Sequence, residues 1–172
     1  DPHDPKFNNL WNQLDQAQKQ NMKIVLMVGG AGTAYQTLFS DFETYYQLLY
    51  NLIKDKPVIT GIDLDVEELV KLEDIKMLIK RIRSDFGINF CISMAPIAYS
   101  LENDSPGMGG FNYKDLYHSP EGAQIDYFNV QCYGSYSKEV YDDIIQNGYP
   151  PNKIIMGMIY GQDIHNIIVE LD

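Results

Sequence analysis

Three acidic residues, Asp63, Asp65 and Glu67, occupy every second position of the segment 63–67, and aliphatic residues stand between them. In a β-strand, alternate side chains share one face, so the carboxylates point to one side and the aliphatic side chains to the other. Carboxylates about 7 Å apart repel each other, and burial in a parallel sheet disfavours their charged forms. We therefore expect the pKa of at least one of these acids to be raised.

A carboxylic acid that stays protonated near neutral pH can act as the general acid in cleavage of a glycosidic bond, and neighbouring carboxylates can stabilise the developing cation. Glu67 ends the segment, at the carboxyl edge where α/β barrels place their active sites. Two other interpretations fit the spacing: a solvated acidic edge strand and a cation site. An EF-hand loop does not fit, because the sixth position is not Gly and the intervening residues are aliphatic. The spacing alone leaves these alternatives open.

Two other motifs were considered as binding sites. The segment Gly29-Gly30-Ala31-Gly32 requires a sharp turn or a close approach of the backbone, but it lacks the ending of a P-loop and the spacing of a dinucleotide fingerprint. The histidines His3, His118 and His165 have no metal-ligand spacing between them. We therefore expect no metal site and no cofactor.

Apolar runs and helical periodicities alternate along the chain and must position these residues. The predicted strands are 23–28, 58–67, 89–95, 127–133 and 153–158. Helical spacing predicts helices over 7–20, 42–52, 72–82 and 137–145. Strands that alternate with helices predict a mostly parallel sheet covered by helices, either doubly wound or closed as a barrel.

Local signals mark the ends of these elements. Ser40 followed by Glu43 matches a capping box at the start of the second helix, and Gly87 is a candidate C-cap residue for the third. The segment 100–110 is rich in Gly, Ser, Asn and Pro and is long for a connector, so it is expected to form a functional rim.

Composition limits the classes of partner. The chain has 172 residues, 45% of them hydrophobic, which predicts one domain spanning residues 1–172. Its formal net charge of −11 disfavours nucleic acid and anionic membrane surfaces, and no apolar run reaches the roughly 20 residues that span a bilayer. Cys91 and Cys132 lie in apolar runs and are expected to be buried free thiols. The oligomeric state is left open.

The segment Thr60 to Glu67 resembles the Asp-Gly-x-Asp-x-Asp-x-Glu signature of the family-eighteen glycoside hydrolases, the chitinase and endo-N-acetylglucosaminidase group. Thr60 replaces the first Asp. Residues 23–30 are similar to a second signature of the family, with Met27 in place of a Ser and both glycines kept. The segments 93–96 and 128–133 resemble the two strands that follow in family order. The resemblance implies a (β/α)₈ TIM barrel and, on family habit, secretion.

The resemblance also implies a mechanism in which the substrate assists. Glu67 would protonate the leaving oxygen and then activate water, while Asp65 would orient the 2-acetamido group, with Asp63 behind it sharing charge or a proton. Tyr133 would donate its hydroxyl to the acetamido carbonyl, and Gln131 would line the same subsite. The alternatives are an ordinary rim tyrosine for Tyr133 and a satisfied interior polar group for Gln131.

Further candidates for the lining of the sugar cleft are Gly30, Met94 and Tyr99, with core or rim packing as the alternative for Met94 and Tyr99. The expected partner is an oligo- or polysaccharide that contains N-acetylglucosamine. A barrel of this type usually needs about 250 residues. The five predicted strands look like the family's third to seventh, so we expect this chain to cover about five of the eight β/α units.

Three functions remain to be weighed. The first is a chitinase or related endo-β-N-acetylglucosaminidase, which the retained Glu67 favours. The second is a chitinase-like lectin or inhibitor, which the changes at Thr60 and Met27 and the partial barrel favour. The third is an unrelated barrel enzyme that uses the three carboxylates to hold a metal ion.

Overall fold

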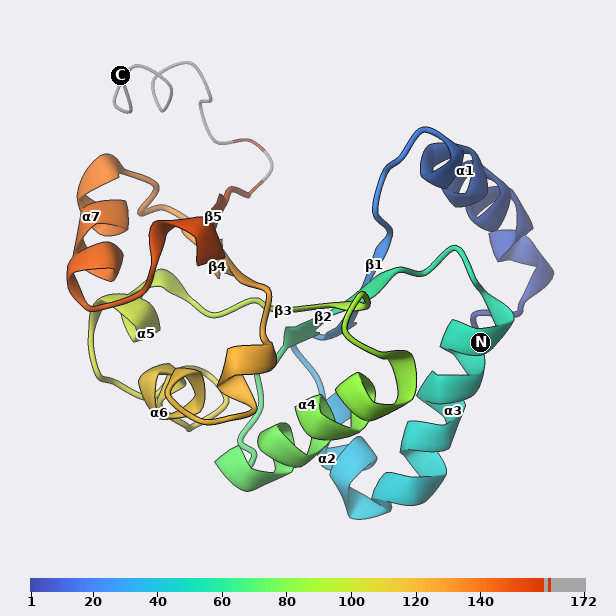
Figure 1. The fold of residues 1–172 in the computed structure, drawn as a ribbon, viewed down its shortest axis with the longest axis horizontal. Coiled ribbons are helices and arrows are strands. Elements are labelled where there is room, and N and C mark those ends of the chain that lie inside the picture. Colours follow the sequence, from blue (N-terminus) through green and yellow to red (C-terminus); the bar gives the residue numbers. More distant parts are fainter. Residues whose placement is uncertain (160, 162–172) are drawn as a thin grey trace.

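The computed structural model describes residues 1–159 and 161. Its centre is a five-stranded sheet in which every neighbouring pair is parallel and the strand order follows the sequence (Figure 1). The strands are β1 (Val25–Gly29), β2 (Gly61–Asp65), β3 (Cys91–Met94), β4 (Tyr127–Gln131) and β5 (Ile154–Gly157). All five predicted strands are confirmed. A doubly wound sheet reverses its strand order at a switch point, so the sequential order is that of a (β/α) barrel in part.

Helices connect the strands and lie outside the sheet, with α2, α3, α4 and α6 on one side of it in Figure 1. The α-helices are α1 (Asn8–Lys19), α2 (Ala34–Ser40), α3 (Phe42–Asp55), α4 (Leu72–Phe86), α5 (Ala98–Glu102), α6 (Tyr113–Tyr117) and α7 (Lys138–Gln146). Short 3-10 turns are η1 (Pro5–Phe7), η2 (Gly122–Gln124) and η3 (Pro151–Lys153). The four predicted helices are confirmed, whereas α2, α5 and α6 are too short to show a clear period.

The caps of two helices differ in how well the sequence predicted them. Gly87 ends α4 with φ +79°, and its N–H donates to the Arg83 carbonyl, as a C-cap glycine does. The capping box at Ser40 is wrong. Ser40 is the last residue of α2, and the cap of α3 is Asp41, whose carboxylate accepts from the Thr44 N–H at 3.4 Å.

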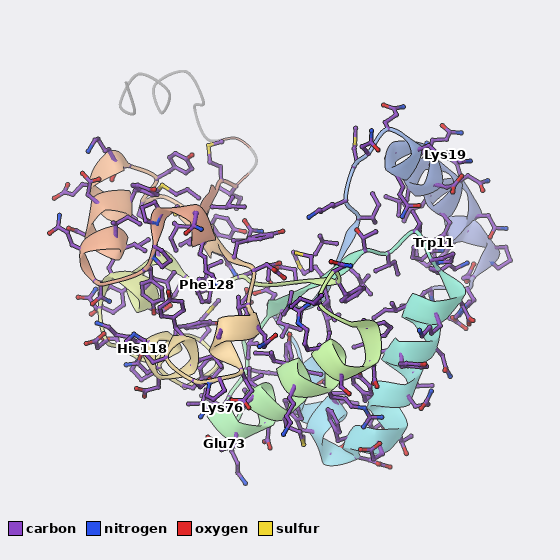
Figure 2. The ribbon with its side chains drawn as sticks, viewed as in Figure 1. Trp11, Lys19, Glu73, Lys76, His118 and Phe128 are labelled. Carbon is purple, nitrogen blue, oxygen red and sulfur yellow. The ribbon has the colours of Figure 1, made fainter. Side chains whose placement is uncertain are left out.

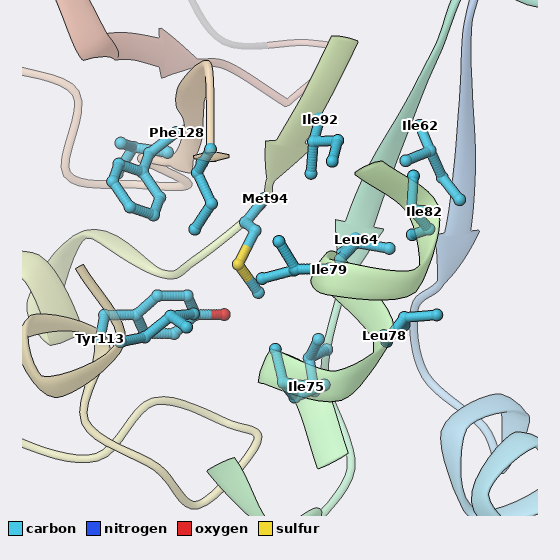
Figure 3. Close-up of a cluster of buried hydrophobic side chains, with 14 of the residues drawn as sticks. Ile62, Leu64, Ile75, Leu78, Ile79, Ile82, Ile92, Met94, Tyr113 and Phe128 are labelled. Carbon is cyan, nitrogen blue, oxygen red and sulfur yellow. The ribbon is translucent and has the colours of Figure 1, made fainter. Parts of the chain in front are cut away.

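The core lies between the sheet and the helices. Figure 3 shows Ile62 and Leu64 of β2 and Ile92 of β3 facing Ile79 and Ile82 of α4, all of them fully buried. Each such side chain contributes about 1.5–3 kcal/mol through removal of apolar surface from water. Cys91 and Cys132 are both buried and unpaired, as expected. The apolar face of β2 therefore anchors the strand and turns its acidic face the other way.

The opposite face of the sheet is the interior side of the barrel. Met27 pairs in register with Asp63 on this face, and Ile155 pairs with Asn129. Met27 is 58% exposed and Ile155 49% exposed. Among the described residues, β1 and β5 each have a strand neighbour on one side only. None of the described helices has the length and apolar character needed to cross a membrane.

Candidate active site

The acidic strand has the predicted alternation. Asp63 and Asp65 lie on the interior face and are 5% and 6% exposed, while Ile62 and Leu64 are buried against the helices. The Ser93 hydroxyl on β3 donates to Asp63 Oδ1 at 2.5 Å. A buried carboxylate needs such donors, because burial without a partner costs several kcal/mol or forces protonation.

Burial changes the protonation of these acids. It raises the pKa of Asp63, although hydrogen bonds from the Ser93 and Asn129 side chains oppose the change. It also raises the pKa of Asp65 to about 6, helped by the negative charges of Glu67 and Asp63 and partly offset by the hydrogen bond from Gln131. The expectation that at least one pKa is raised is confirmed. The side chains of Asp65 and Glu67 are hydrogen-bonded to each other, and this bond also raises the pKa of Asp65.

Gln131 connects the acids across the sheet. It is the last residue of β4, and its side-chain Nε2 donates to Asp65 Oδ1 at 3.0 Å and lies 3.4 Å from Glu67 Oε1. The same nitrogen donates to the Ala95 carbonyl at 2.8 Å, beyond the end of β3. Gln131 thereby holds Asp65 and Glu67 near each other at the carboxyl edge of the sheet.

A cavity of about 150 Å³ opens beside Asp65 on the interior face. The residues around it come from β1, β2, β4 and β5 and from the segments that follow β3, β4 and β5: Met27, Asp65, Ala95, Asn129, Val130, Gln131, Tyr133, Gly157 and Met158. The structure thus brings Asp65, Gln131 and Tyr133 to one hollow. The Tyr133 side chain is 53% exposed there, so its hydroxyl can reach a ligand.

Two glycines at the end of β1 lie beside Asp65. Gly29 has φ +111° and Gly30 has φ +83°, a backbone conformation that favours glycine. A Cβ on Gly29 would stand 2.0 Å from the Asp65 carbonyl oxygen, so only glycine fits there. The Gly30 N–H donates to that carbonyl at 2.9 Å, and its open side faces Asp65 Oδ2. The turn or close approach expected for these glycines is confirmed.

Met94 and Tyr99 are not among the residues around the cavity beside Asp65. Met94 does not line the cleft: it is fully buried on the helix-facing side of β3, near Tyr113 and Ile79 (Figure 3). Its position pairs in register with Leu64, so the strand alternation turns it into the core. This agrees with the alternative of core packing. Tyr99 is 59% exposed on α5.

Three residues of this region carried no assigned role in the sequence. Ser93 and Asn129 share the face of the acids, and strand alternation in the predicted strands 89–95 and 127–133 could have found them. Thr60, which replaces the first Asp of the signature, is bound to the neighbouring segment of the chain. Its hydroxyl donates to the Ile24 carbonyl at 3.2 Å and accepts from the Ile24 N–H at 2.9 Å, so it joins β2 to the segment before β1.

Metal ligands were sought among the acids, histidines and cysteines. Within residues 1–159 and 161, no group of three of these side chains is arranged to hold a metal ion. Figure 2 shows His118 just beyond α6, where its ring packs on that of Tyr117 at 5.4 Å. His165 lies outside the described residues.

Comparison with solved structures shows the family. A fungal endo-β-N-acetylglucosaminidase from glycosyl hydrolase family 18 is 36% identical, superposes with a TM-score of 0.86, and matches 99% of this chain and 66% of its own. The chain belongs to glycosyl hydrolase family 18. A chitinase, ChiC, from Aspergillus fumigatus is 30% identical with a TM-score of 0.81, and the match covers 92% of this family 18 chain and 58% of the chitinase.

A third structure shares the fold alone. The chitinase-like agglutinin RobpsCRA from Robinia pseudoacacia is 17% identical with a TM-score of 0.53, and the match covers 86% of the family 18 chain and 53% of the agglutinin. No family sequence model and no curated protein matches the chain. The chain spans less than two thirds of the length of each of these structures, so it forms part of a TIM barrel.

Proposed function

We propose that residues 1–172 form part of one catalytic domain that cleaves β-1,4-linked N-acetylglucosamine polymers, chitin or a related glycan. The observation that carries this proposal is the arrangement of Asp63, Asp65 and Glu67 on one face, with Gln131 within hydrogen-bond reach of the last two. Two of the similar structures are those of an endo-β-N-acetylglucosaminidase and a chitinase, which supports the substrate class.

Glu67 is the proposed acid and base. In the first step its carboxyl proton passes to the glycosidic oxygen, and the bond between that oxygen and the anomeric carbon breaks. The carbonyl oxygen of the sugar's own 2-acetamido group forms the new bond to the anomeric carbon from the opposite face. An oxazolinium ion results, and the leaving sugar departs as an alcohol.

Asp65 and Tyr133 hold the acetamido group for this attack. The Asp65 carboxylate accepts the acetamido N–H and stabilises the positive charge that develops on the ring, while the Tyr133 hydroxyl donates to the carbonyl oxygen. Gln131 fixes the position of Asp65 through its 3.0 Å hydrogen bond. Asp63, held by Ser93, lies behind Asp65 and shares charge with it.

Water completes the reaction on the side that the leaving sugar vacated. The Glu67 carboxylate takes a proton from this water, whose oxygen forms a bond to the anomeric carbon as the oxazolinium bond breaks. The acetamido group is restored and Glu67 is protonated again. Two inversions at one carbon give net retention of the anomeric configuration.

The second candidate function is a carbohydrate-binding protein without turnover. Met27 and Thr60 depart from the family signatures, and the structure places Met27 in the lining of the cavity beside Asp65. The likeness to a chitinase-like agglutinin shows that this fold occurs in a protein of that title. The two functions therefore differ in whether Glu67 acts as a proton donor to a bound sugar.

The test is turnover of a chromogenic chitobioside by the full-length protein and its Glu67→Gln variant. Glutamine keeps the shape of the side chain but cannot donate a carboxyl proton, so kcat is expected to fall by about 100-fold or more. Binding of chito-oligosaccharides, measured by calorimetry, should persist in the variant. Glu102→Gln, on the surface of α5, is the matched control and should turn over normally. A full-length protein that binds these sugars but never cleaves them would establish the lectin instead.

A further inference from the structure

Glu68 directly follows the proposed acid and is a buried carboxylate outside the mechanism above. It is 7% exposed. Its Oε1 accepts from the Tyr35 backbone N–H at 2.7 Å, and its Oε2 accepts from the Gln36 N–H at 2.9 Å. Both oxygens are therefore used by the first turn of α2, which offsets the cost of burying the charge.

These contacts close one end of the loop Gly30–Thr33, which joins β1 to α2. The other end is held by the Gly30 N–H, which donates to the Asp65 carbonyl at 2.9 Å. Tyr35 strengthens the same junction, since its hydroxyl donates to the Val28 carbonyl at 2.8 Å and its ring leaves no room for a Cβ on Gly29. The loop is thus fixed at both ends to the segment 65–68 that carries the acids.

We propose that Glu68 is a positioning residue of the active site, an inference that rests on the proposed function. Glu68 is bonded directly to Glu67 in the chain and lies in a bend after β2, so anchoring its carboxylate to α2 fixes the backbone that carries Glu67 near Gln131. The same anchor holds Gly30 against Asp65, the acid proposed to hold the acetamido group. Glu68 acts through Glu67 and the loop and does not touch the substrate.

The alternative is that Glu68 is an ordinary helix cap whose loss lowers stability and nothing else. Asp126 provides a matched comparison, because its carboxylate also accepts a backbone N–H from another segment, that of Ile92 at 2.7 Å. Asp126 precedes β4 and so lies at the amino edge of the sheet, away from the acids. Asp126 is more exposed than Glu68 and also pairs with Arg83 at 3.4 Å, so Asp126→Asn weakens a carboxylate anchor between two segments without a path to Glu67.

The experiment compares Glu68→Gln and Asp126→Asn in the full-length protein. In Glu68→Gln the amide NH₂ faces one of the two backbone donors, so hydrogen exchange should quicken in residues 30–36, whereas Asp126→Asn should leave these amides unchanged. A misplaced acid is expected to lower kcat/KM by up to about 100-fold and to alter its pH profile. Calorimetric affinity for chitotriose should also fall in Glu68→Gln alone.

The outcomes separate this inference from the proposed function. Suppose that both variants lower the melting temperature equally, while Glu68→Gln keeps the wild-type kcat/KM, pH profile and chitotriose affinity. Glu68 is then only a helix cap, and the inference is wrong. If the wild-type protein binds chitotriose without cleaving the chitobioside, the hydrolase proposal fails. In that case, weaker chitotriose binding and faster exchange in Glu68→Gln alone would still support the positioning role.

Discussion

At the scale of the residue, Asp65 interacts with both of the other acids of the site and with Gln131. It accepts a hydrogen bond from Gln131, shares one with Glu67, and lies near the charge of Asp63. Burial and the two negative charges raise its pKa from 3.8 to about 6, so Asp65 keeps its proton to a higher pH in the folded protein than in the unfolded chain. The Asp65 carboxylate can accept an acetamido N–H, but its ionisation costs more free energy in the folded protein than in the unfolded chain.

The raised pKa gives stability a defined pH dependence. Between about pH 4 and pH 6 the folded protein retains a proton that the unfolded chain has released, so the free energy of unfolding falls as the pH rises through this window. The change in pKa corresponds to a loss of about 3 kcal/mol above pH 6. Asp65→Asn removes this cost, so the variant should gain stability over wild type as the pH rises from 4 to 6, with no further gain above.

Urea unfolding of the full-length protein at a series of pH values measures this difference. Asp15→Asn, on the exposed surface of α1, controls for the removal of one negative charge. A difference between Asp65→Asn and wild type that stays constant from pH 4 to pH 8 would show that Asp65 is not held protonated by its surroundings.

At the scale of the element, Thr60 binds β2 to the chain that enters β1. Its hydroxyl makes two hydrogen bonds with the backbone of Ile24, beside the backbone bond from the Thr60 N–H to the Ile24 carbonyl. Thr60 thus replaces the Asp of the family signature with a hydroxyl group that donates one hydrogen bond and accepts another. The register it helps to set places Met27 opposite Asp63 and Gly29 opposite Asp65.

Thr60→Val should therefore destabilise the protein by about 1–3 kcal/mol, because the half-buried Ile24 N–H loses its partner. Thr60→Ser keeps the hydroxyl and should cost less. The measurement is the urea midpoint of both variants in the full-length protein. Equal losses in the two variants would mean that the methyl group of Thr60, and not its hydroxyl, is what matters.

At the scale of the whole molecule, the sheet has two outer strands with interior-facing apolar side chains in solvent. Met27 on β1 and Ile155 on β5 are each about half exposed, and each strand pairs on one side only among the described residues. Unpaired strand edges promote association. The chain spans 66% of the fungal family 18 structure.

We expect residues 1–172 alone to self-associate and to lack turnover. Met27→Lys and Ile155→Lys should reduce this association, because a charge on an edge strand disfavours pairing with another chain. In the full-length protein the same changes should cost about 2 kcal/mol or more, since each side chain would then be buried. Sedimentation velocity of the isolated chain and urea unfolding of the full-length protein test the two expectations.

Leu48→Lys is the control for these experiments, because Leu48 is exposed on α3 and does not belong to the sheet. An isolated chain that is monomeric and cleaves the chitobioside would contradict the expectation. The expectation would also be contradicted if Leu48→Lys changed association and stability as much as Met27→Lys and Ile155→Lys do.

The sequence by itself determined the parallel α/β fold and the shared face of Asp63 and Asp65, because the side-chain periods of strands and helices are local properties of the chain. It could not determine which distant side chains meet these acids. Ser93, Gln131 and Glu68 reach their partners through strand register and loop closure, which depend on packing between segments 30 or more residues apart. It also left the direction of Met94 open, because an apolar residue fits a core and a sugar cleft equally well until the register is known.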